Sequence, residues 1–158
     1  ESFYKKTIQT FYKDELWEIE EETLLLLTYK NYYTMKKIMI IEDDKDLQEI
    51  YKLNFELAGY EVLQEMDGLD GISSVVEKMP DIILLDIMMP NMDGFAFLKA
   101  LKDNTSINIP VVICSNLSDK DTYAKAITAG ATSVLLKVDY SGKQLVEKIG
   151  HILNGVNI

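Results

Sequence analysis

Polar and charged groups follow four separate apolar runs of this sequence. Glu42 and Asp43 come directly after KIMII, and Asp86 comes directly after IILL. Ser115 ends the run VVICS, and Lys137 ends the run SVLLK. Carboxylates that lie close together repel one another and raise each other's pKa unless a cation lies among them. If the fold brings these runs together, the groups form an acidic cluster flanked by a hydroxyl and an ammonium group.

This combination of groups is suited to moving a phosphoryl group onto a carboxylate. Carboxylate oxygens suit Mg²⁺, which takes one or two of them and keeps several waters. Lys137 is a compact positive charge, and Ser115 can donate a hydrogen bond to a phosphoryl oxygen. Asp86 then serves as the in-line nucleophile while the metal and the lysine neutralise developing charge. Each residue alone is more often a turn residue, helix cap or surface charge, so the hypothesis rests on their joint occurrence.

Apolar runs alternate with amphipathic segments from Met35 onward, and this alternation predicts an α/β fold. The predicted strands lie at 37–42, 60–66, 81–86, 110–115 and 132–137. The predicted helices lie at 44–59, 68–79, 94–104, 119–130 and 141–155, with Asp44 or Asp46 capping the first and Asp93 the third.

Continuous apolar strands separated by helices indicate a parallel sheet that is covered on both faces. Right-handed crossovers then favour a doubly wound, five-stranded sheet of order 2-1-3-4-5. Ligands bind at the carboxyl ends of the strands in such folds, which is where the polar groups stand. The run at 60–66 ends in no comparable group, as expected of an edge strand.

Composition argues against several classes of function. The 158 residues carry a net charge of −10, and all sixteen basic residues are lysines. This balance argues against nucleic acid as a direct partner. No apolar run is long enough to span a bilayer, so we expect no membrane association. The single cysteine, Cys114, makes no internal disulfide and is predicted to lie in the core, which favours a reducing, cytoplasmic compartment.

Residues 1–34 differ in composition from the rest and are predicted to be a separate extension from the domain at 35–158. Their apolar residues partly follow a helical period, so the extension is expected to be partly helical. Its role stays open between a docking helix, the tail of a preceding domain, and upstream sequence that is not normally translated.

Over residues 35–156 the sequence resembles the receiver domain of two-component response regulators, in the CheY-like superfamily with a flavodoxin-like fold. The motifs that carry the resemblance are IIEDD, LLDIMMPNMDG, VVICS and GATSVLLK. The resemblance implies that Asp86 is the phosphoacceptor, Ser115 the switch hydroxyl and Lys137 the charge partner of the phosphoryl group. The metal ligands that it implies for Mg²⁺ are Glu42, Asp43, Asp86 and the backbone carbonyl of Met88.

The resemblance also implies partners. Such domains take a phosphoryl group from the phosphohistidine of a sensor histidine kinase or a histidine phosphotransfer protein. They are signalling phosphoacceptors rather than enzymes, catalysing only their own phosphorylation and a slow dephosphorylation. The implied contact with a downstream protein uses the face formed by 119–130, 132–137 and 141–155. Because the sequence ends at Ile158, we expect a single-domain regulator whose output is protein contact or onward phosphotransfer.

Five positions bear on how such a domain would switch. Asn116, Val134 and Val138 stand where the family usually has a small residue, an aromatic residue and a proline. They leave open an alternative, a pseudo-receiver that binds partners constitutively without phosphotransfer. Met88 and Leu117 occupy the two positions that tune phosphoryl lifetime, and their apolar side chains predict slow self-dephosphorylation. An Asp-nucleophile phosphatase is discounted, because that class of enzyme needs a second Asp two residues after the nucleophile and this chain has Met88 there.

Overall fold

The computed structural model describes residues 35–104, 106–117 and 119–155. The predicted helical extension at 1–34 lies outside these residues. Within them, no helix is both long and apolar enough to cross a membrane.

Five parallel strands form one sheet in the order β2-β1-β3-β4-β5. This confirms the predicted α/β class and strand order, with the second strand at an edge. The strands are β1 (Lys37–Ile41), β2 (Glu61–Glu65), β3 (Ile82–Leu85), β4 (Val111–Ser115) and β5 (Ser133–Leu136).

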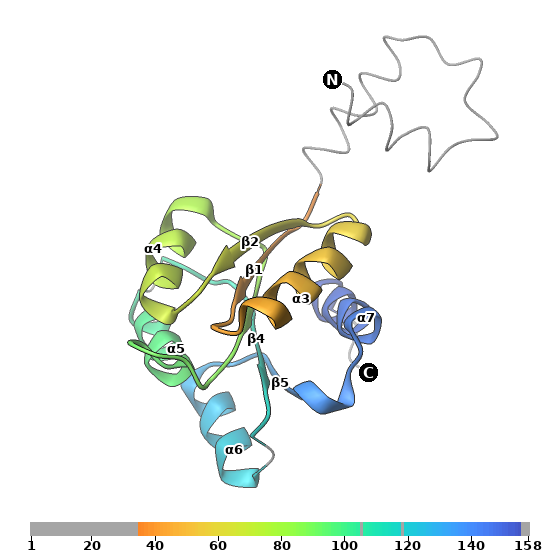
Figure 1. Ribbon diagram of the computed structural model, residues 1–158. Coiled ribbons are helices and arrows are strands. Elements are labelled where there is room, and N and C mark those ends of the chain that lie inside the picture. Colours follow the sequence, from red (N-terminus) through yellow and green to blue (C-terminus); the bar gives the residue numbers. More distant parts are fainter. Residues whose placement is uncertain (1–34, 105, 118, 156–158) are drawn as a thin grey trace, which may run out of the picture. The chain divides into compact units, whose positions relative to one another are not determined.

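Helices cover both faces of the sheet (Figure 1). One face carries α3 and α7, whose buried side chains join one core cluster, and the other carries α4, α5 and α6 with a second cluster. The helices are α3 (Lys45–Leu57), α4 (Gly68–Lys78), α5 (Gly94–Asp103), α6 (Lys120–Ala129) and α7 (Gly142–Leu153), with a short 3-10 helix η1 (Lys137–Asp139) after β5.

Successive residues of the central strands pack into opposite core clusters. In β1, Met39 belongs to the cluster under α4, α5 and α6, whereas Ile40 belongs to the cluster under α3 and α7. In β3, Ile83 and Leu84 divide in the same way. Side chains alternate across a strand, so a strand buried on both faces must be apolar throughout. This explains why these runs do not alternate with polar residues.

Side-chain N-caps explain where the predicted helices begin. The Asp44 carboxylate, rather than that of Asp46, accepts hydrogen bonds from the first turn of α3. The Asp93 carboxylate accepts from the backbone N–H of Ala96 at the start of α5, as predicted. α3 therefore begins two residues after Asp43, whereas a loop at residues 87–93 separates Asp86 from the start of α5.

Candidate functional site

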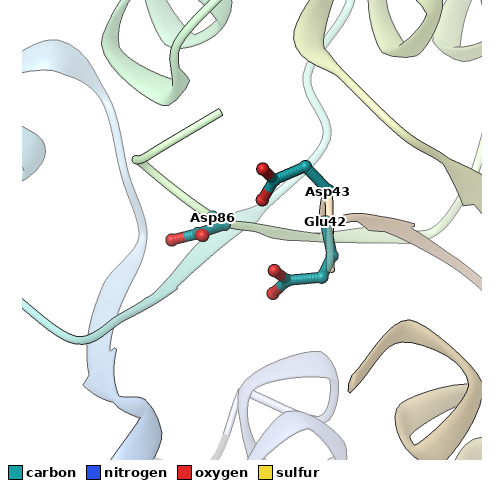
Figure 2. Close-up of side chains that lie close together, drawn as sticks. All are labelled: Glu42, Asp43 and Asp86. Atoms are coloured by element: carbon teal, nitrogen blue, oxygen red, sulfur yellow. The ribbon is translucent and has the colours of Figure 1, made fainter. Parts of the chain in front are cut away.

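Three carboxylates meet where β1 and β3 end (Figure 2). Glu42 and Asp43 follow β1, and Asp86 follows β3, whose last residue lies opposite the last residue of β1. One oxygen from each carboxylate can be chosen such that all lie within 4.8 Å of one another. Glu42 and Asp86 are buried, and Asp43 is exposed. An all-oxygen, anionic donor set with one open side fits a hard divalent cation such as Mg²⁺.

Lys137 links two of these carboxylates. It follows β5, two strands away from β3, and its side chain is 11% exposed. Its Nζ lies 2.6 Å from Oε2 of Glu42 and 2.9 Å from Oδ2 of Asp86. Burial alone would lower the pKa of Lys137, but its hydrogen bonds and charge interactions with the two carboxylates outweigh burial and raise it. The ammonium group therefore stays charged beside Asp86 throughout the neutral range.

The Glu42 carboxyl has a raised pKa. Its burial is the main cause, and it outweighs the lowering by the hydrogen bond and charge of Lys137. The negative charge of Asp86 raises the pKa further. Lys137 thus only partly offsets the cost of burying the charged form of Glu42, and an added cation would favour that charged form.

The raised pKa of Glu42 predicts a pH-dependent difference between the native chain and Glu42→Gln. A carboxyl whose folded-state pKa lies above its unfolded value stabilises the fold below the unfolded value, about 4.5, and this contribution is lost as the pH rises through the folded-state pKa. We therefore expect the free energy of unfolding of Glu42→Gln, relative to that of the native chain, to increase as the pH rises from 4 to 7. Urea unfolding in metal-free buffer at several pH values measures this, with Glu56→Gln on the exposed side of α3 as the matched control. A constant difference across that range would contradict it.

Both oxygens of Asp86 have partners. The backbone N–H of Ile87 donates to Oδ1 at 2.7 Å, and Lys137 donates to Oδ2. The next helix begins against this strand end, because a Cβ on Gly94 would lie only 2.6 Å from the backbone carbonyl oxygen of Asp86. The glycine in the sequence MDG therefore allows α5 to start close to Asp86, which holds the connecting loop near the carboxylates.

The predicted hydroxyl and its neighbour lie at the end of β4, the strand next to β3. Ser115 is 1% exposed, and its Oγ accepts a hydrogen bond of 3.4 Å from the backbone N–H of Leu117. Cys114 is buried, as predicted, with its Sγ 3.7 Å from the hydroxyl oxygen of Tyr51. Burial raises the pKa of the Cys114 thiol to about 11, so it is not a reactive thiolate at neutral pH.

Apolar side chains line a surface pocket next to the loop that follows Asp86. Met88 is 64% exposed, and Leu117 is half-buried. Both border a cavity of about 520 Å³ whose wall also includes Phe95 and Lys125, with the Lys125 ammonium 3.9 Å from the centre of the Phe95 ring. The structure thus brings the two predicted lifetime positions to one cavity.

The three positions that depart from the family pattern lie around the same edge. Asn116 is exposed directly after β4, and Val138 is 82% exposed in η1. Val134, in β5, is half-buried and packs against the core cluster beneath α4, α5 and α6.

Sequence reasoning missed Gln48, which supports the site from α3. It is buried, and its side-chain amide donates to the backbone carbonyls of Glu42 at 3.3 Å and Glu65 at 2.7 Å. These bonds tie together the ends of β1 and β2. The sequence held one signal for this role. Gln48 is polar, but it lies three residues before Tyr51 and seven before Phe55, on the helix face that this spacing assigns to the core.

Residues 38–150 match the family model for the response regulator receiver domain. The chain belongs to this family. The match covers both core clusters and the strand ends described above, and it confirms the predicted resemblance and the assignment to two-component signalling.

Curated relatives with receiver domains include transcriptional regulators. RpaA of Synechocystis, described as a DNA-binding dual master transcriptional regulator, is 36% identical over 104 residues, which is 65% of this chain and 43% of the relative. PhoB of Pseudomonas aeruginosa, a phosphate regulon transcriptional regulatory protein, is 29% identical over 75% of this chain and 52% of its own length. The chain spans about half the length of these relatives.

Solved receiver domains have the same fold. A DNA-binding response regulator of the LuxR family from Staphylococcus aureus is 30% identical with a TM-score of 0.70, over 76% of this chain and 100% of that one. The Francisella response regulator 1452 receiver domain is 27% identical with a TM-score of 0.70, over 77% and 99%. Because some of these proteins bind DNA, the absence of a nucleic-acid partner stays a prediction, as do the single-domain organisation and the boundary at residue 35.

Proposed function

We propose that this receiver domain accepts a phosphoryl group on Asp86 with Mg²⁺ and passes the signal on by protein contact. The observation that carries the proposal is Lys137, whose Nζ lies within 2.9 Å of both Glu42 and Asp86 at the side of a three-carboxylate cluster. A buried carboxylate held by a cation at one oxygen has a fixed orientation, and the same cation can neutralise charge that develops during attack on phosphorus.

The covalent step is a displacement at phosphorus. A carboxylate oxygen of Asp86 forms a new P–O bond as the P–N bond of a phosphohistidine breaks, and the electron pair of that bond stays on the imidazole nitrogen. Lys137 neutralises charge on the phosphoryl oxygens, and the Ser115 hydroxyl can donate a hydrogen bond to one of them. The product is an acyl phosphate on Asp86.

Glu42, Asp43, Asp86 and the backbone carbonyl of Met88 are the proposed Mg²⁺ ligands. When bound, the ion would supply positive charge to the phosphoryl oxygens and reduce repulsion among the carboxylates. The oxygen-only donor set and the raised pKa of Glu42 support this assignment.

The proposed donor is a sensor histidine kinase or a histidine phosphotransfer protein, in the cytoplasm. The domain catalyses only its own phosphorylation and dephosphorylation and is not otherwise an enzyme. Its downstream partner contacts the face formed by α6, β5 and α7. Half-buried Val134 lies in this face, so the output change there proceeds without an aromatic side chain that changes rotamer.

Self-dephosphorylation of the purified phosphoprotein should be slow, with a half-life of minutes or longer. The apolar side chains of Met88, two residues after Asp86, and Leu117, two residues after Ser115, supply no group to orient an attacking water. Met88→Asn should shorten the half-life, whereas Met79→Asn, at an exposed position on the far end of α4, should leave it unchanged. Loss of the phosphoryl mass with time measures both, and a native half-life of seconds would contradict the prediction.

Beryllofluoride, which mimics a phosphoryl group on a carboxylate, tests the proposal. Adding it with Mg²⁺ should shift the amide NMR signals of residues around Asp86, and omitting Mg²⁺ or replacing Asp86 with Asn should abolish the shifts. The alternative, a pseudo-receiver that binds partners constitutively, predicts an unchanged spectrum under all of these conditions. The intact set of Asp86, Ser115 and Lys137 favours the phosphoacceptor.

A further inference from the structure

The loop between β3 and α5, residues 87–93, carries the proposed carbonyl ligand of Met88. Its inner side is fixed by the buried residue Ile87, whose carbonyl accepts hydrogen bonds from the backbone N–H of Met89 at 3.2 Å and of Gly94 at 3.0 Å. Met88 itself is exposed between these anchors. The carbonyl of Met88 therefore lies between this fixed inner part and the outer part of the loop, residues 90–93.

Asn91 holds the outer part of the loop to α4. Its backbone has a φ of +61°, a left-handed conformation that asparagine tolerates better than most residues. Its side-chain amide donates a hydrogen bond of 2.7 Å to Oδ2 of Asp67. The two residues are 24 positions apart in the chain, so this bond is a tertiary contact rather than part of a local turn.

Asp67 uses its other carboxylate oxygen to begin α4. Oδ1 accepts from the backbone N–H of Leu69 at 2.9 Å and of Asp70 at 3.0 Å, which makes Asp67 the N-cap of that helix. One carboxylate thus orders a helix start and a loop together. Hydrogen bonds from the Asp70 backbone and from Asn91 lower the pKa of Asp67, so it remains ionised in this role.

A second contact joins the same two segments. Gly68, the first residue of α4, lies so close to the loop that an added Cβ would be 2.7 Å from the backbone oxygen of Met92 and 2.9 Å from its Cγ. Contact with a backbone oxygen cannot be relieved by a change of rotamer. The start of α4 therefore lies directly against the loop beside Asn91.

We propose that Asp67 and Asn91 form a latch that positions the 87–93 loop for metal binding, so that the start of α4 sets the Mg²⁺ affinity of the Asp86 site. Both are positioning residues, because among the described residues neither makes a hydrogen bond or ion pair to Glu42, Asp43 or Asp86. The inference rests on the proposed function for its metal. Partners that orient a ligand from outside the coordination sphere commonly change metal affinity about 10–100-fold when they are removed.

Two substitutions open the latch and leave the local backbone requirements satisfied. Asp67→Ser keeps an N-cap oxygen for α4 but removes the second oxygen that accepts from Asn91. Asn91→Gly keeps the positive φ accessible but removes the amide. The matched controls are Asp119→Ser at the N-cap of α6 and Asn104→Gly at the end of α5.

The first measurement is amide hydrogen exchange of residues 87–89 and 91–93 in metal-free protein, since Pro90 has no amide hydrogen. Exchange should be faster in both latch variants than in the native chain and the controls. The double variant should show no more than the larger single effect, because two residues that act through one bond do not add.

The second measurement is the Mg²⁺ concentration that gives half-maximal beryllofluoride binding, which should rise about tenfold in both latch variants. Gly68→Ala, which displaces the loop by another route, should raise it as well. The latch would be overturned if loop exchange were unchanged in the variants. It would also be overturned if the native chain responds to Mg²⁺ and the variants require the same Mg²⁺ concentration. A native chain with no response to Mg²⁺ would instead contradict the proposed function.

Discussion

Replacing Lys137 with Met should lower the rate of Asp86 phosphorylation by acetyl phosphate at least about 100-fold, the usual effect of removing a charge-stabilising donor. The substitution keeps most of the apolar stem and removes the charge that lies 2.6 Å from Glu42 and 2.9 Å from Asp86. Charge that develops on the phosphoryl oxygens then has no ammonium group beside it. The initial rate of phosphoprotein formation at fixed Mg²⁺, followed by intact mass, measures the change.

The control for Lys137 is another lysine with an equally short ion pair. Lys36 lies 2.8 Å from Asp81, but its side chain is 60% exposed. Exposed ion pairs contribute little to stability, and this one lies at the opposite end of the strands from Asp86. Lys36→Met should therefore leave the phosphorylation rate unchanged. A Lys137→Met rate within a few-fold of the native rate would mean that this charge is not used in the reaction.

Replacing Phe97 with Ala should lower the free energy of unfolding by about 3–5 kcal/mol, the usual cost of truncating a fully buried aromatic side chain. Phe97 is 0% exposed in α5 and packs against α4, where a Cβ on Gly71 would lie 3.1 Å from its ring. The cavity left behind would lie among β1, α4 and α5, next to Ile41 and Gly71. Such a loss is a large fraction of the stability of a typical domain.

Phe95→Ala provides the matched comparison for Phe97→Ala. Phe95 lies in the same helix, but it is half-buried, and one face of its ring contacts the Lys125 ammonium group at the surface. Its loss should cost well under half as much, because less area leaves the core and water can reach the site. Urea unfolding of both variants measures the difference. Equal losses would contradict the placement of Phe97 in the core.

The fold was predictable because its central strands are apolar at every position. Ile82–Leu85 leaves no polar face, so it fits only a parallel strand covered on both sides. Once the sheet is parallel, the rule that strand ends share one edge brings Glu42, Asp86 and Lys137 together without any knowledge of contacts. Helix boundaries were less certain, since Asp44 and Asp46 carry the same capping chemistry and only backbone geometry separates them.

The supporting contacts were not predictable from local pattern. In the sequence, Gln48 is an ordinary polar helix residue. Only the structure shows that its amide bonds the backbone at the ends of β1 and β2. The bond between Asp67 and Asn91 joins two loops whose separation in space depends on how α4 packs. In the sequence, Asn91 beside Pro90 indicates only a turn, and its pairing with Asp67 depends on tertiary structure. Periodicity reports which face of an element is buried, not which side chains meet.

The central claim, that Asp86 is a Mg²⁺-dependent phosphoacceptor, is tested most directly by mass. The native chain and Asp86→Asn are incubated with acetyl phosphate with and without Mg²⁺, and each intact mass is measured. We predict the addition of one phosphoryl group to the native chain in the presence of Mg²⁺, and no addition to Asp86→Asn or to the native chain without the ion. An unmodified native chain in Mg²⁺, or an Asp86→Asn chain modified to the same extent, would contradict the claim.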